Sequence, residues 1–180
     1  RQVGVLHERL GPSGALMLRS DLATGERAPE VPVTTLDGRE RVLGAPREDG
    51  RATLLLFVAP DCPMCKELLP AARALARQAR DQLELVLASD GEVEAQERLV
   101  ADEGLEAFDY VLSQPLGLAY RVSRLPFAAL IDERGVLRSY GLVNSREHLE
   151  SLVEAAERDV ASVQEWAARQ EAAPAKEGQA

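Results

Sequence analysis

The sequence predicts an α/β protein in which helices cover both faces of a central sheet, and three observations predict it. Two continuous apolar runs, Thr53 to Val58 and Leu83 to Ala88, have the length expected of strands covered on both faces. An amphipathic helical pattern with short joints separates them, as in a βαβ unit with parallel strands. A second group of two strands and a helix follows after Pro126.

The composition favours one globular domain. The chain has 180 residues, of which 46% are hydrophobic, and a formal net charge of −9. Its arginines are interleaved with acidic residues, so nucleic acid is not an expected partner. The longest apolar run, Leu54 to Pro60, is strand-sized and well short of the roughly 20 residues of a membrane span. We therefore expect the chain as given to be soluble.

The domain is expected between two tails. Residues 1–24 mix Gly, Pro and short apolar pieces, which predicts a linker or extended arm. Residues 25–169 contain the regular elements. Residues 170–180 are rich in Ala, Glu, Gly and Lys and are expected to be disordered. Because the first residue is Arg1, we expect an upstream segment, such as a membrane anchor, to be missing.

The first half of the domain begins with a hairpin and continues into the βαβ unit. Asp37 and Gly38 separate two β-prone stretches between Val31 and Leu43, which is a hairpin signal. The Thr53 to Val58 run reads as the central strand. The helix that follows has an apolar stripe formed by Leu68, Leu69, Ala72, Leu75, Ala76 and Ala79. An acidic surface helix, Glu92 to Glu103, comes after the second strand.

The second half begins with a stretch through Tyr110 and Tyr120 that looks irregular. Two strands are then expected, joined by an Asp-Glu-Arg-Gly turn; these segments are Phe127 to Ile131, Asp132 to Gly135 and Val136 to Gly141. A long helix is predicted to begin at Asn144, whose spacing to Glu147 fits a capping box. Its apolar face contains Leu149, Leu152, Val153, Ala156, Val160 and Val163.

This order of elements, with a C-x-x-C motif where the first helix begins, predicts a thioredoxin-like fold. The fold would combine βαβ and ββα units in a three-layer α/β/α sandwich, with an added N-terminal β-hairpin.

Cys62 and Cys65 are the expected catalytic residues. A helix N-terminus stabilises a thiolate through its free N–H groups and its dipole, and Cys62 is placed to receive that help. Pro63 suits the first helical turn, where a missing N–H costs nothing, and it is expected to contact the substrate together with Met64 and Leu125. Cys65 lies one turn further and can resolve a mixed disulfide. The alternative is that the two cysteines form an inert disulfide or remain buried thiols.

Pro126 forms the second part of the predicted site. We expect a cis Leu125–Pro126 bond that faces the Cys62 loop and leaves the Leu125 backbone available to pair with an extended substrate peptide. The alternative is an ordinary trans proline at the start of a strand. Met64 is expected to be an adaptable apolar contact on the substrate face, although a soft copper ligand is a second possibility.

No cofactor or metal site is expected. A structural zinc would need two ligands besides the cysteines, and the two histidines, His7 and His148, come from opposite ends of the chain. The redox-active group would be the Cys62–Cys65 disulfide itself.

Several of these stretches resemble a known family. Phe57 to Leu69 and Leu125 to Phe127 look like the redoxin and TlpA-like branch of the thioredoxin superfamily. Gly4 to Met17 and Gly141 to Leu152 are similar to the MauD family of methylamine utilisation proteins. The resemblance matches Cys62 and Cys65 to the redox pair and Pro126 to the cis proline.

The resemblance also implies a cellular location and protein partners. Members of that family are implied to be tethered to the inner membrane by an N-terminal helix, with the redoxin domain in the periplasm. They are implied to assist disulfide formation in the small subunit of methylamine dehydrogenase, which would make that subunit the client. A second partner in the membrane or periplasm would reset the thiols.

Some residues depart from the pattern of thioredoxins. Asp61 replaces a tryptophan, Leu56 replaces a buried acid, and Leu125 replaces a common Thr or Val. These departures favour a dedicated client over general disulfide reduction, which is the main alternative.

A peroxidase is less expected because Ala59 occupies the position where Thr or Ser usually precedes a peroxidatic cysteine. A copper-binding module is the third alternative.

Overall fold

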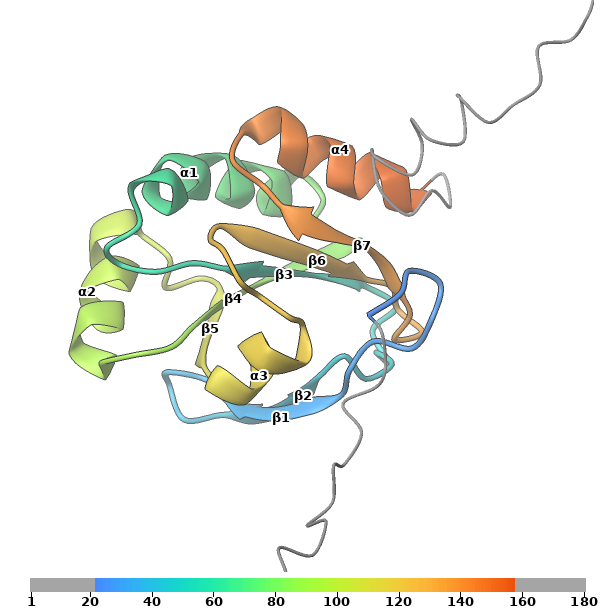
Figure 1. Ribbon diagram of the computed structural model, residues 1–180, viewed down its shortest axis with the longest axis horizontal. Coiled ribbons are helices and arrows are strands. Elements are labelled where there is room, and N and C mark those ends of the chain that lie inside the picture. Colours follow the sequence, from blue (N-terminus) through green and yellow to red (C-terminus); the bar gives the residue numbers. More distant parts are fainter. Residues whose placement is uncertain (1–21, 158–180) are drawn as a thin grey trace, which may run out of the picture.

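A computed structural model describes residues 22–157, which form a five-stranded sheet and a separate two-stranded hairpin (Figure 1). The strands of the large sheet follow the order β5-β4-β3-β6-β7. Their bounds are Ala52–Phe57 for β3, Leu83–Ser89 for β4, Asp109–Leu112 for β5, Phe127–Ile131 for β6 and Leu137–Leu142 for β7. Strands β3, β4 and β5 run parallel, whereas β6 is antiparallel to both β3 and β7. The predicted βαβ and ββα units and the central strand are confirmed.

The sheet lies between two covering layers. One face carries α1, α2 and α4, which span Pro63–Gln78, Val93–Glu103 and Arg146–Glu157. The other face carries the short helix α3, Gln114–Ala119, and the hairpin of β1, Val31–Thr34, and β2, Glu40–Leu43. Figure 1 shows α1 and α4 on one side of the sheet and the hairpin with α3 on the other. The three-layer arrangement and the added hairpin are therefore confirmed.

The apolar run of β3 supplies both layers because successive strand side chains point to opposite faces. Leu54 and Leu56 pack into the cluster beneath α1, and Leu55 and Phe57 pack into the cluster beneath α3 and the hairpin. The three leucines are 0% exposed. Burial of one such side chain contributes roughly 1.5 to 3 kcal/mol, so this strand is a main source of the domain's stability.

The stretch through Tyr110 and Tyr120 is not irregular, and the prediction for it is wrong. It forms β5 and α3, and α3 begins at a Ser113 cap whose Oγ accepts the Leu116 N–H at 3.2 Å. Both elements are too short to show a repeating apolar pattern, so periodicity does not find them.

The last helix also begins later than predicted. Helix α4 starts at Arg146, and the Oγ of Ser145 accepts the N–H of His148 at 3.2 Å. Asn144 and Ser145 are both good capping residues, and the serine takes the position. Val160 and Val163, which were expected on this helix, lie outside the described residues. So do the expected tail and most of the expected N-terminal arm.

The start of the described chain pairs with the end of the sheet where β7 begins. The Gly25 N–H donates to the Leu137 carbonyl at 2.8 Å, and Arg27 forms a bridge with Val136. This end of β7 lies next to Ile131, which pairs with Thr53 near the start of β3. Within residues 22–157, no helix is both long and apolar enough to cross a membrane.

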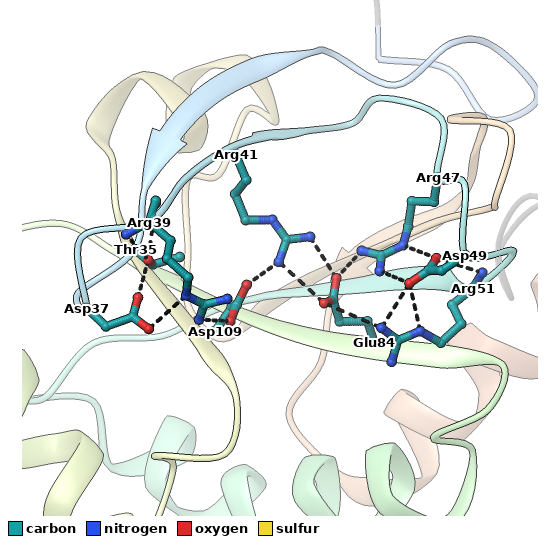
Figure 2. Close-up of polar contacts among 9 residues, drawn as sticks. All are labelled: Thr35, Asp37, Arg39, Arg41, Arg47, Asp49, Arg51, Glu84 and Asp109. Atoms are coloured by element: carbon teal, nitrogen blue, oxygen red, sulfur yellow. Dashed lines mark hydrogen bonds and ion pairs between the residues drawn. The ribbon is translucent and has the colours of Figure 1, made fainter.

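A network of arginines and carboxylates fastens the hairpin to the sheet (Figure 2). Arg41 of β2 reaches two strands at once, because its guanidinium contacts Glu84 of β4 at 2.7 Å and also bonds Asp109 of β5. Arg39 binds Asp109 at 2.6 Å, and Arg47 binds Glu84. Of these side chains only Arg39 is mostly exposed, so the network is a partly buried seam between hairpin and sheet.

Candidate functional site

Cys62 is the N-cap residue of α1. Its backbone is extended, with φ −96° and ψ 105°, and its Sγ accepts the N–H of Cys65 at 3.2 Å. Pro63 occupies the first helical turn, where its fixed φ suits the helix and its missing N–H is not needed. The strand-to-helix junction thus places one sulfur atom against the free N–H groups of a 16-residue helix.

The two cysteines form a disulfide and differ in accessibility. Cys62 and Cys65 are bonded, with a Cα–Cα distance of 5.3 Å. Cys62 is partly exposed, whereas Cys65 is 0% exposed and belongs to the apolar cluster beneath α1. An incoming thiol or disulfide therefore meets Cys62 first.

Pro126 lies at the same end of the sheet as this disulfide. The Leu125–Pro126 peptide bond is cis, as predicted, and Pro126 is buried. Phe127 pairs with Phe57, the last residue of β3, and the Cys62 loop follows β3. Pro126, which directly precedes Phe127, is therefore at the end of the sheet where that loop begins. The Pro126 carbonyl accepts the N–H of Val143 at 3.1 Å, which secures the loop against the end of β7.

Leu125 and Met64 provide exposed surface at this end. Leu125 is 38% exposed, and no hydrogen bond within residues 22–157 involves its backbone N–H or carbonyl. Met64 is 41% exposed on the first turn of α1, next to the exposed Pro63. Further exposed apolar side chains lie at the same end, namely Leu118 and Leu142.

A groove of about 440 Å³ opens beside the proline loop. Phe57, the last residue of β3, and the following Val58 line it, and they make its base apolar. Arg124 and Leu125 line it on the proline-loop side, whereas Asp90 belongs to the loop that follows β4. Sequence reasoning did not find this groove, because its lining comes from four separate segments of the chain.

The Asp90 loop is held by buried polar side chains that the sequence reading also missed. Gln96 of α2 donates from Nε2 to the Asp90 carbonyl at 2.9 Å and accepts the Tyr110 hydroxyl at 2.6 Å. Both side chains are nearly fully buried. Burial raises the pKa of Tyr110 to about 12, so the hydroxyl stays protonated at physiological pH. One signal was available, since a glutamine three residues before Leu99 lies on the apolar face of α2.

Metal ligands are not clustered in the part of the chain that the structure describes. Within residues 22–157, no group of three or more His, Cys, Asp and Glu side chains could hold a metal ion.

Comparison with known proteins shows the family. The model of the AhpC/TSA family matches residues 24–170. The MauD methylamine utilization protein of Paracoccus denitrificans is 39% identical over 168 residues, which cover 93% of this chain and 83% of that protein. MauD of Methylophilus methylotrophus is 37% identical over 97% of this chain and 82% of its own length. The chain belongs to the AhpC/TSA family, and within it to the MauD proteins.

Solved structures confirm the thioredoxin-like fold of this chain. It is similar to a putative thiol:disulfide interchange protein DsbE from Chlorobium tepidum, with a TM-score of 0.66 and 20% identity. That similarity covers 75% of this chain and 98% of the other. DsbF from MTB gives a TM-score of 0.61 with 21% identity, over 72% of this chain and 98% of that one.

The geometry of the Cys62–Cys65 site suits thiol–disulfide exchange. A thiolate at the Cys62 position would gain the capping N–H of Cys65, and Cys65 is close enough to displace whatever binds to Cys62. The predicted pair and the predicted proline are thus brought to one end of the sheet. The roles predicted for Pro63, Met64 and Leu125 in substrate binding stay predictions.

Proposed function

We propose that this protein is an extracytoplasmic thiol:disulfide oxidoreductase whose substrate is a folding protein client. The observation that carries the proposal is the Cys62–Cys65 disulfide at the N-terminus of α1, with the first sulfur accessible and the second buried. The Leu125 backbone makes no hydrogen bond within residues 22–157 and lies at the same end of the sheet, which supports a client in extended conformation, because such a strand can bond to free main-chain groups.

The exchange proceeds in two steps that conserve atoms and electrons. In the reducing direction, the Cys62 thiolate attacks one sulfur of a client disulfide, and the other client sulfur leaves as a thiolate that takes up a proton. The Cys65 thiolate then attacks Cys62 and releases the second client sulfur. The protein is oxidised by two electrons and the client disulfide is reduced. In the oxidising direction the same steps run in reverse.

For the client, we propose the small subunit of methylamine dehydrogenase. The relatives are named for methylamine utilization, and the resemblance to them implies maturation of that disulfide-rich subunit. The same resemblance supports a periplasmic location, with a membrane or periplasmic partner that resets the redox state of Cys62 and Cys65. An N-terminal membrane tether is likewise a proposal drawn from the family.

The test is to trap the client covalently. In a Cys65→Ser variant, Cys62 can attack but the mixed disulfide cannot be resolved, so client proteins accumulate on Cys62. The variant is produced in the periplasm of a methylamine-grown host, and adducts are identified by mass spectrometry after non-reducing electrophoresis. Cys62→Ser is the matched control and should give no adduct.

The identity of the adducts decides between the readings. A predominant adduct with the dehydrogenase small subunit supports the proposed client. Adducts spread over many unrelated proteins would instead support a general TlpA-like reductase. If Cys65→Ser gives no more adduct than Cys62→Ser, the exchange function is wrong.

A further inference from the structure

Two buried side chains help to hold one wall of the groove beside Leu125. The wall includes Asp90, in the loop where the chain turns from β4 into α2, and the next residue, Gly91, has a φ of +99°. The Gln96 Nε2 donates to the Asp90 carbonyl, and the Tyr110 hydroxyl donates to the Gln96 Oε1. Gln96 is 1% exposed and Tyr110 is 3% exposed.

The orientation of the Gln96 side-chain amide is fixed because an amide has one acceptor end and one donor end. The Tyr110 hydroxyl donates to the oxygen of Gln96, so the NH₂ end must face the Asp90 carbonyl. A reversed amide would set two carbonyl oxygens against each other. Tyr110, on β5, thus orients Gln96, on α2, and Gln96 fixes the loop that follows β4.

We propose that Gln96 and Tyr110 are positioning residues for the protein client, an inference that rests on the proposed function. An extended client strand bonded to the Leu125 backbone lies across the mouth of this groove. A side chain that flanks the client cysteine then enters the groove, whose base of Phe57 and Val58 favours an apolar side chain. Asp90, whose carbonyl is held by Gln96, sets the width of the groove that this side chain meets.

Two single variants and their combination separate positioning from stability. Tyr110→Phe leaves the Gln96 oxygen without its donor, and Gln96→Leu removes the acceptor to which the Tyr110 hydroxyl donates. Either single change lowers the urea midpoint of unfolding, whereas the double variant recovers most of it, since neither polar partner remains. The double variant still lacks the bond to Asp90. Tyr140→Phe is the control, because it removes a comparable tyrosine bond, 2.8 Å to the Leu22 carbonyl, elsewhere in the fold.

The assay compares two substrates of the reduced protein. One is a peptide of about 15 residues with a central cysteine held as a glutathione mixed disulfide and flanked by leucine; the other is glutathione disulfide. Each reaction yields two thiols and the oxidised protein, and each is followed by acid quenching and mass spectrometry. The ratio of the two second-order rate constants reports the use of the groove, independently of the reactivity of Cys62.

We expect this ratio to fall about tenfold in Gln96→Leu and in the double variant, the size of one hydrogen bond's effect on binding. Tyr140→Phe should keep the wild-type ratio. An unchanged ratio in the double variant would overturn the positioning role, and so would an equal fall in Tyr140→Phe. If the unmodified protein reduces neither substrate, the proposed function itself fails.

Discussion

Gly44 shows how one residue can be fixed by both its backbone angle and its surroundings. Its φ is +89°, and a Cβ atom there would lie 2.1 Å from the Pro29 carbonyl oxygen. The same oxygen accepts the Tyr120 hydroxyl at 3.0 Å, so it is not free to withdraw without loss. Only glycine satisfies both conditions at this position.

Replacement of Gly44 by alanine should therefore cost more than its backbone angle alone explains. Gly38 is the matched control, because its φ is +86° and no atom lies within 4 Å of a Cβ built on it. We expect Gly38→Ala to lower the free energy of unfolding by about 1 to 2 kcal/mol, and Gly44→Ala by about 2 to 5 kcal/mol. Urea unfolding measures both, and equal losses would show that the contact with Pro29 relaxes freely.

Asp132 organises the turn between β6 and β7. Its Oδ1 accepts the N–H groups of Arg134 and Val136 at 2.9 and 2.8 Å, and its Oδ2 accepts from Arg138 Nε at 2.9 Å. Burial of the carboxyl group acts to raise its pKa, but the two N–H donors and the charge of Arg138 outweigh it. The net result is a pKa below the usual value of 3.8.

The sign of this shift gives a pH dependence. The carboxylate contributes its stabilisation fully above the pKa of the unfolded chain, about 3.9, and loses it as pH falls through the lower folded pKa. Asp132→Asn should lower stability at pH 7 by about 1 to 3 kcal/mol and reduce the further loss below pH 4. Thermal unfolding between pH 7 and 3 tests this, with Asp81→Asn as an exposed control. A variant as acid-sensitive as the wild type would contradict the assignment.

At the scale of elements, the hairpin depends on Arg41. Its guanidinium joins β2 to β4 and β5 through Glu84 and Asp109, in a seam where these three side chains are 12 to 21% exposed. Desolvation acts to lower the pKa of Arg41, but its two carboxylate partners raise it overall. The charge is therefore permanent, and removing it would leave two carboxylates with fewer partners.

Arg41→Ala should loosen the hairpin more than Arg39→Ala does. Arg39 also bonds Asp109, yet its side chain is 61% exposed, so solvent screens the pair and its loss should cost little stability. We expect about 1 to 3 kcal/mol for Arg41→Ala. Faster amide hydrogen exchange in β1 and β2 should accompany it. If the two variants lose equal stability, the partly buried seam is not what holds the hairpin.

The elements differ in how far they could be predicted, and length explains the difference. Strands β3 and β4 and helix α1 have enough residues for an apolar period to appear, and the Asp37-Gly38 hairpin has a turn signal of its own. Strand β5 has four residues and α3 has six, so neither shows a period. Their places are determined by pairing with β4 and by burial of Leu116 and Tyr120, which only the folded chain supplies.

At the scale of the whole molecule, the same limit applies to the site. Cys62, Pro63 and Cys65 are neighbours in sequence, so their chemistry could be predicted from spacing and from the strand that precedes them. Pro126 could be placed only through the order of elements. The Gln96–Tyr110 pair and the Arg41 seam join residues 14 to 68 positions apart, and no local pattern predicts such contacts.

The pairing of Gly25 with Leu137 determines how the domain is oriented when it is attached to a surface through its N-terminal side. Residues 25–27 join the sheet at the end where β3 begins, and the disulfide lies past the point where β3 ends. A bead, sensor chip or fused carrier attached upstream of Leu22 would hold the domain at the end of the sheet opposite the disulfide. The sulfur pair would then point outward into the medium, ready to meet a macromolecule arriving from the bulk.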